Sequence, residues 1–383
     1  MDVLFDYQAF EMQTMGGISR MFAELLMHLG DQGISCTLGV RESDNVYLRK
    51  SGLLPKLKPA GYRNKKWFGH EQYFHGEDRL KRFIFNTIGY SMTPNPDYCI
   101  EMLKKQSFDV FHPTFFNPYF LDYLGKKPFV LTIHDMIPEL YPQCFDKDDM
   151  QVIGKRILAP KASAIIAVSE KTKEDIIRIL HIPDEKVHVI YHGCSFNKPA
   201  ELRRPYDFPY LLYVGDRNIY KDFTHFVQSA ASTLCKHDGL KLVCTGRPFT
   251  AMELSLFASL GIQDRVVHHW VEDDDEFFSL YHYAECFVFP SEYEGFGIPI
   301  LEAYAADCPV LLNNVSCFPE IAGDAAVYFS FGLPGDLEAK LEYMLSMQSG
   351  ERESLIQKQR DRLSLYSWEK SARQLAVVYG SIV

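Results

Sequence analysis

The segment Ser-Glu-Tyr-Glu-Gly-Phe-Gly-Ile-Pro-Ile-Leu-Glu-Ala at residues 291–303 has the residue types of a ligand-binding turn. Gly295 and Gly297 let backbone N–H groups come close to a ligand, and the proline that follows favours the first turn of a helix. The start of that helix would offer free N–H donors and the positive end of its dipole to an anion or to sugar oxygens. Glu294 could accept hydrogen bonds from sugar hydroxyls, and Glu302, about two turns into the helix, could reach a ribose. The alternative interpretation is a structural turn with two surface glutamates.

A second segment, Tyr-Val-Gly-Asp-Arg-Asn-Ile-Tyr-Lys-Asp-Phe at residues 213–223, could hold a diphosphate. The strand expected here ends at Gly215, and Arg217 and Lys221 follow in a loop that leads into a helix. Two cations beside a glycine turn can neutralise a diphosphate without a metal ion. Asp222 adds a negative charge nearby and could cap the helix. The alternative interpretation is an ordinary solvated basic pair.

Gly16 and Gly17 follow the first expected strand, where α/β sheets commonly carry a nucleotide-binding loop. The pair is not part of a G-x-G-x-x-G pattern, so a nicotinamide cofactor is not indicated. Arg20 lies in the helix that begins here and is a further candidate contact. Taken alone, such a glycine pair is more often a plain turn.

Two histidines stand at the ends of expected strands, which is the usual place for functional side chains in a parallel sheet. His134 ends the strand in Thr-Ile-His-Asp-Met-Ile-Pro, and His112 ends the strand in Phe-Asp-Val-Phe-His-Pro. Asp135 could orient His134 or cap a turn. For both histidines the alternative is a hydrogen-bonded structural side chain.

The acidic run at residues 272–276 contains a D-x-D spacing that could bind a metal ion. The run directly precedes a helical pattern, and acidic residues are favoured at a helix N-terminus. We therefore expect a helix start here, and no metal ion or other cofactor.

Short apolar runs alternate with helical patterns along the whole chain, which is typical of parallel sheets covered by helices on both faces. After residue 17, a helix is predicted with its apolar residues on one face. A proline-rich and charged stretch at 196–209 suits an interdomain linker. The runs predict ten strands: Val3–Phe5, Asp109–Phe111, Phe129–Ile133, Ala164–Val168, Val187–Ile190, Tyr210–Val214, Leu240–Cys244, Arg265–His268, Cys286–Phe289 and Val310–Leu312.

Length and composition set broad limits. A chain of 383 residues suits two domains, and 47% apolar with 23% charged residues is globular composition. The net charge of -10 gives no basic footprint for nucleic acid. Nine scattered cysteines without a C-x-x-C pair indicate reduced thiols rather than a disulfide scaffold or a zinc site. Neither a signal-peptide pattern nor an apolar run long enough to span a bilayer is seen, so we expect a cytoplasmic protein.

With these motifs, the chain resembles the family-4 retaining glycosyltransferases, which have the GT-B fold of two Rossmann-like α/β domains facing across a cleft. The resemblance is strongest over 210–330 and around 129–142. It implies an N-terminal acceptor-binding domain at 1–197 and a nucleotide-sugar-binding domain at 198–365. The last helix, at 366–383, would pack back on the first domain.

The resemblance also implies roles for individual residues. Glu294 would contact the donor sugar and Glu302 the ribose, while Arg217 and Lys221 would hold the diphosphate. His134 would lie beside the transferred sugar. The His192-Gly193 pair resembles an Asn-Gly pair of the family but receives no catalytic role. The implied donor-binding set is Gly16, Gly17, Gly215, Arg217, Lys221, Gly246, Glu294, Gly295, Phe296, Gly297, Ile298 and Glu302. The acceptor-side candidates are Arg20, His112 and Asp135.

The implied reaction is metal-independent hexosyl transfer with retention from a nucleotide diphosphate sugar, with GDP-mannose as the leading donor. The acceptor would be a glycan or lipid-linked saccharide in bacterial surface polysaccharide synthesis. Two alternatives stay open: a nucleotide-sugar epimerase of the same architecture, and a non-catalytic sugar-nucleotide binding protein. Residues 41–90 carry 11 Lys/Arg against 5 Asp/Glu with aromatic residues between them. This segment could meet an anionic membrane on its inner face, or it could be a solvated excursion between strands.

Overall fold

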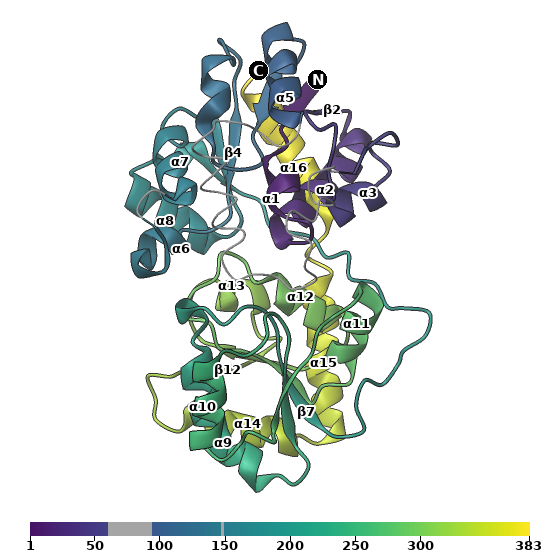
Figure 1. The fold of residues 1–383 in the computed structure, drawn as a ribbon, viewed down its shortest axis with the longest axis vertical. Coiled ribbons are helices and arrows are strands. Elements are labelled where there is room, and N and C mark those ends of the chain that lie inside the picture. Colours follow the sequence, from purple (N-terminus) through teal and green to yellow (C-terminus); the bar gives the residue numbers. More distant parts are fainter. Residues whose placement is uncertain (60–93, 147–148) are drawn as a thin grey trace, which may run out of the picture.

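The computed structural model describes residues 1–59, 94–146 and 149–383, which form two α/β units (Figure 1). Most of the basic segment 41–90, including its aromatic residues from Trp67 to Phe85, lies outside the described residues. In the part of the chain that is described, no helix is long and apolar enough to cross a membrane.

The first unit has six described parallel strands in two three-stranded sheets, ordered β2-β1-β3 and β4-β5-β6. A single bridge between Phe111 and Phe129 joins the two sheets edge to edge. The strands are β1 (Asp2–Phe5), β2 (Ser35–Leu38), β3 (Val110–His112), β4 (Val130–Ile133), β5 (Ala164–Ala167) and β6 (Val187–Val189). The helices are α1 (Gln8–Met12), α2 (Gly17–Leu29), α3 (Val46–Lys50), α5 (Asn95–Lys105), α6 (Ile137–Leu140), α7 (Met150–Leu158) and α8 (Glu170–Leu180).

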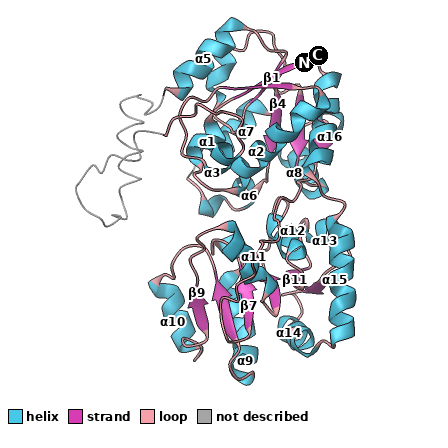
Figure 2. Ribbon diagram, turned by 90° about the vertical axis from the view of Figure 1, so that its right-hand side faces the viewer, coloured by secondary structure: helices cyan, strands magenta, loops and turns pink. Residues whose placement is uncertain are grey.

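The second unit has one six-stranded parallel sheet in the order β12-β11-β10-β7-β8-β9, with helices on both sides (Figure 2). Its strands are β7 (Tyr210–Tyr213), β8 (Lys241–Cys244), β9 (Val266–His268), β10 (Cys286–Phe289), β11 (Val310–Asn313) and β12 (Val327–Phe329). Its helices are α9 (Phe223–Lys236), α10 (Ala251–Ser259), α11 (Asp274–His282), α12 (Ile298–Ala305), α13 (Phe318–Ala322), α14 (Asp336–Ser346) and α15 (Ser349–Leu363).

The two faces of the second sheet bury two separate apolar clusters. Leu212 and Phe287 pack with α11 and α12 on one face, whereas Leu211 and Val288 pack with α9 and α14 on the other. Because successive side chains of a strand point to opposite faces, strands buried on both sides read as continuous apolar runs. This explains why the sequence predicts them well.

The last helix, α16 (Trp368–Ser381), leaves the second unit and packs against the first (Figure 1). Its buried residues Trp368, Leu375 and Tyr379 join the core that contains Val3 and Met21. The first unit is therefore built from two separate stretches of chain.

The ten predicted strands are confirmed to within one residue at each end. The helix predicted after residue 17 is confirmed as α2. Two strands were not predicted, β2 (Ser35–Leu38) and β12 (Val327–Phe329), and both lie at the edge of a sheet. The strand order of the second unit reverses between β7 and β10, so the loops that follow these two strands meet at one point of the sheet edge. Ligands of open α/β sheets bind at such a switch point.

Candidate active site

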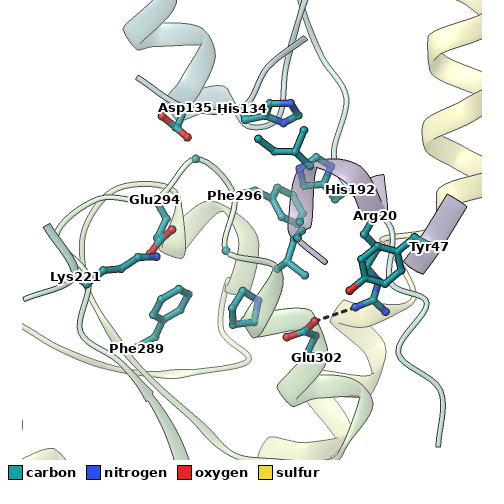
Figure 3. A pocket seen from close by; sticks show the side chains of 17 residues that line it. Arg20, Tyr47, His134, Asp135, His192, Lys221, Phe289, Glu294, Phe296 and Glu302 are labelled. Atoms are coloured by element: carbon teal, nitrogen blue, oxygen red, sulfur yellow. Dashed lines mark hydrogen bonds and ion pairs between the residues drawn. The ribbon is translucent and has the colours of Figure 1, made fainter. Parts of the chain in front are cut away.

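A cavity of about 370 Å³ lies between the two units, at this switch point. One wall comes from the loops after β7 and β10 and the start of α12, and the other from the start of α2 and the end of β4 (Figure 3). The residues that line it are Gly16, Gly17, Ile18, Arg20, Tyr47, His134, Asp135, His192, Lys221, Phe289, Glu294, Gly295, Phe296, Gly297, Ile298, Pro299 and Glu302. Sequence motifs from four distant parts of the chain therefore meet in one place.

Lys221 and Glu294 point toward each other across the second unit's wall of the cavity (Figure 3). Lys221 Nζ donates to Glu294 Oε1, and Ser291 Oγ donates to the same oxygen over 2.8 Å. Burial acts to lower the pKa of Lys221, but Glu294 and, more weakly, Asp135 outweigh it and raise that pKa. The ammonium group is thus held charged inside the cavity.

The tip of α12 forms the floor between the two glutamates. Gly297 precedes the helix with φ +88°, a left-handed conformation that favours glycine, and Pro299 occupies the first turn. By helix geometry the Ile298 N–H has no carbonyl partner within α12, whereas Pro299 has no N–H and the Ile300 N–H donates to the Gly297 carbonyl over 2.9 Å. The free N–H and the positive end of the helix dipole can bind an anion. Glu302 lies just over one turn into α12, which is closer to the tip than the two turns predicted.

Arg20 and Glu302 form an ion pair between the two units. Arg20 Nη1 lies 3.2 Å from Glu302 Oε1, and Tyr281 donates its hydroxyl to Glu302 Oε2 over 3.2 Å. Arg20 Nη2 also donates to Ser195 Oγ over 3.3 Å. Burial raises the pKa of Glu302, although Arg20 and Tyr281 oppose this effect. Both side chains are close to fully buried, with 12% of Arg20 and 9% of Glu302 exposed.

His134 and Asp135 form the opposite wall, at the end of β4. Burial lowers the pKa of His134 to about 4, with Lys155 adding to the effect and Asp135 opposing it, so the ring is neutral near pH 7. Lys155 Nζ donates to the Asp135 carbonyl over 3.1 Å and lies 2.7 Å from Glu139 Oε2. This buried ion pair fixes the loop that carries both cavity residues.

Arg217, predicted to hold a diphosphate with Lys221, is not among the residues that line the cavity. Its side chain is 4% exposed, and Nε lies 2.5 Å from Glu253 Oε1. Nη1 donates to the carbonyl of Thr245, and Nη2 donates to those of Arg247 and Pro248. Each nitrogen of the guanidinium group therefore already has a partner within the second unit.

Three further predicted residues also lie outside the cavity lining. His112 is fully buried, with Nδ1 2.6 Å from the Tyr379 hydroxyl and Nε2 2.9 Å from Thr132 Oγ1. Its acceptor-side prediction is corrected to the structural alternative, because both ring nitrogens have partners. Gly215 and Gly246 pack backbone to backbone at the ends of β7 and β8, since a Cβ on Gly246 would lie 2.6 Å from the Gly215 carbonyl oxygen.

Several residues that contribute to the site were missed. Tyr47 and Phe289 line the cavity, and Tyr47 stacks near Arg20, whose Cζ lies 5.6 Å from the ring centre. His192 also lines it, with its ring centre 4.7 Å from that of Phe296. In the sequence, Phe289 ends a predicted strand and His192 follows one, and these positions are the signals that such a role leaves.

The acidic run at 272–276 is a helix start, as predicted. Asp273 is the N-cap of α11, and its side chain accepts from the Glu276 N–H over 2.8 Å. Among the described residues, no group of three acidic, histidine or cysteine side chains is arranged to hold a metal ion.

Asp222 is the N-cap residue of α9, with φ +47°, but its side chain makes no capping hydrogen bond. Aspartate is among the residues that tolerate this left-handed conformation best.

Comparisons with known proteins cover most of the chain. A family model described as Glycosyltransferase Family 4 matches residues 15–198, and one described as Glycosyl transferases group 1 matches residues 195–362. The chain is 29% identical to O-antigen chain mannosyltransferase B of Escherichia coli over 290 residues, which is 70% of this chain and 74% of that one. It is also 29% identical to an O-antigen chain mannosyltransferase of Salmonella typhimurium over 199 residues, 52% of this chain and 55% of the other.

One solved structure of the same fold is that of Anabaena HepE in complex with UDP and glucose. The two structures superimpose with a TM-score of 0.70 over the whole of both chains, at 15% sequence identity.

Proposed function

Because this chain belongs to the family-4-type glycosyltransferases of the GT-B fold, we propose that it moves a hexose from a nucleotide diphosphate sugar to a saccharide acceptor with retention of configuration. The observation that carries the proposal is the meeting of Lys221 and Glu294 beside the tip of α12. A cation, a carboxylate and the positive end of a helix dipole are partners that suit a sugar-bearing diphosphate.

Donor binding would exchange partners within the cavity. Lys221 Nζ would give up its hydrogen bond to Glu294 and donate to a phosphate oxygen instead. The Glu294 carboxylate would then accept hydrogen bonds from the sugar hydroxyls. Arg20 would supply the second cation, because it lines the cavity and Arg217 does not. Glu302, which Arg20 already contacts, would bind the ribose.

The transfer step would break the bond between the anomeric carbon and the phosphate oxygen, and would form a bond from that carbon to the acceptor oxygen. The acceptor proton would pass to the departing phosphate. Lys221, Arg20 and the tip of α12 would stabilise the growing phosphate charge, as preorganised electrostatic groups do. The proposal places this charge on protein groups alone, so a chelator should leave turnover unchanged.

The substrates proposed here follow the names of two relatives, both of which are called O-antigen chain mannosyltransferases. We propose GDP-mannose as the donor and a glycan or lipid-linked saccharide of a bacterial surface polysaccharide as the acceptor. A peripheral membrane contact through residues 41–90 stays a proposal, since most of that segment lies outside the described residues.

Thermal shift with UDP, GDP, TDP and ADP sugars tests the donor, and nucleotide release in the presence of saccharide acceptors tests the reaction. Lys221→Met should abolish turnover. The matched control is Lys358→Met, which removes an exposed lysine paired with Asp324 over 3.0 Å and should have no effect. Normal turnover by Lys221→Met would refute the proposed site. Conversion of the donor to another sugar without an acceptor, seen by nuclear magnetic resonance, would replace transfer with epimerisation.

A further inference from the structure

Tyr293 lies directly before Glu294 but belongs to a contact between the two units. Its hydroxyl donates to Asp175 Oδ2 of α8 over 2.8 Å. Tyr293 is 4% exposed and Asp175 is fully buried, so this hydrogen bond is shielded from water. Burial and the neighbouring carboxylate both raise the pKa of Tyr293, which keeps the phenol protonated as a donor.

Gly295, directly after Glu294, is held by the same helix of the first unit. Its carbonyl accepts from Ser169 Oγ over 2.6 Å and from Thr172 Oγ1 over 3.2 Å. A Cβ on Gly295 would lie 1.8 Å from the His134 carbonyl oxygen, so the two backbones are in close contact. Helix α8 and its N-cap Ser169 therefore form hydrogen bonds with the residues on both sides of Glu294.

Asp175 is itself anchored on its own helix. Arg178 Nη2 lies 2.6 Å and Lys171 Nζ 3.2 Å from Asp175 Oδ1, while the other carboxylate oxygen is left for Tyr293. A hydrogen bond to an ionised acceptor is about twice as strong as one between neutral groups. The first unit thus holds Asp175 Oδ2 in a fixed position, where it accepts the hydrogen bond from Tyr293 in the loop of the second unit.

We infer that Tyr293 and Asp175 are positioning residues that set Glu294 in register with His134 across the cavity. This inference rests on the proposed function. Most of the donor contacts proposed above, Arg20 apart, come from the second unit, whereas His134 belongs to the first. Loss of the pair should therefore slow transfer far more than it weakens donor binding.

The test compares Tyr293→Phe with Tyr141→Phe. Tyr141 also donates its hydroxyl across the two units, to Glu292 Oε2 over 3.2 Å, but at an exposed site. Tyr293→Phe should lower kcat by about 10- to 100-fold, the range expected for a lost charge-assisted hydrogen bond, while the Kd for the nucleotide sugar changes by less than about threefold. Tyr141→Phe should leave both constants within about twofold, because exposed pairs contribute little.

Asp175→Ala should lower kcat at least as much as Tyr293→Phe, and it should also lower the melting temperature, because Arg178 and Lys171 lose their partner. The double variant should have the same kcat as Asp175→Ala alone, because both changes remove the hydrogen bond between Tyr293 and Asp175. The inference would be overturned if the losses of kcat in the two single variants added up in the double variant. It would also be overturned if Tyr293→Phe weakened donor binding by the same factor as it lowered kcat and also lowered the melting temperature. A kcat for Tyr293→Phe equal to that of Tyr141→Phe would overturn it as well. If Lys221→Met is inactive in that case, the proposed function stands and only the positioning role fails.

Discussion

Replacing Arg217 with alanine should destabilise the second unit while leaving the affinity for the nucleotide sugar nearly intact. The side chain is 4% exposed and its ion-pair partner Glu253 is 14% exposed. Removing one member of a buried pair costs about 3–5 kcal/mol. The lower end applies here, because Glu253 Oε2 still accepts from the Thr250 N–H over 2.6 Å in the absence of Arg217.

A loss of about 3 kcal/mol corresponds to a fall in melting temperature of roughly 6–12 °C for a domain of this size class. The loss should shrink in acid. Burial acts to raise the pKa of Glu253, but hydrogen bonds from Thr250 and Arg217 outweigh it and lower that pKa. The contribution of the pair is therefore present above the ordinary carboxyl pKa and is lost as the pH falls through the lowered value.

The assay is calorimetric melting together with titration of the nucleotide sugar. Lys221→Met should instead lose the donor affinity. Its melting temperature should also fall, because Glu294 loses a partner at a largely buried site, although Glu294 Oε1 still accepts from Ser291 Oγ over 2.8 Å. A double variant, Arg217→Met with Glu253→Leu, should recover part of the stability and keep donor binding, because an apolar pair can replace a buried ion pair. Recovery should be incomplete, because the Thr250 N–H loses its Glu253 partner and three backbone carbonyls lose Arg217. If Arg217→Ala melts within about 2 °C of the parent and fails to bind donor, Arg217 touches the diphosphate and the structural role is wrong.

Three other perturbations give distinct expectations. Arg20→Ala should weaken donor binding by about 10- to 100-fold in a calorimetric titration, since it removes a charge-assisted partner from the cavity, and an unchanged Kd would exclude the proposed second cation. Burial lowers the pKa of both His112 and His192 to about 3, so below pH 6.5 the unfolded chain binds more protons and stability should fall by about 1.4 kcal/mol per pH unit per histidine. Denaturant unfolding between pH 7 and 5 measures this slope, and His112→Asn should reduce it by one proton; an equal slope would contradict the burial of a neutral ring. Gly295→Ala should lower kcat by roughly tenfold or more because its Cβ overlaps the His134 carbonyl, and a fully active variant would show that the contact is not needed.

The fold could be predicted where burial dictates the residue types. Strands β7 and β10 are covered on both faces, so their sequences are continuous apolar runs. The missed strand β2 is an edge strand with polar and exposed residues, and it lacks this signal. The missed strand β12 is apolar, but it is only three residues long and two of its residues are partly exposed. Very short strands are common at sheet edges, and a run of three or four residues predicts a strand only weakly.

The site could be predicted only where a motif is local. Lys221, Glu294 and Glu302 lie in short segments whose glycines and prolines mark turns, and all three line the cavity. The orientation of Arg217 depends on Glu253, which lies 36 positions further along the chain. Side chains can be assigned to a loop from sequence, but the partner that captures them depends on tertiary contacts.

The return of α16 to the first unit has a consequence for how the protein is made. The core around Val3 and Met21 includes Trp368 and Tyr379, which the ribosome adds only after the entire second unit. The first unit therefore cannot complete its core until α16 has been synthesised, and until then the apolar face of α2 lacks its α16 partner. The second unit, although it is translated later, can finish folding before the first. A premature stop codon before residue 368 would damage the unit that was synthesised first.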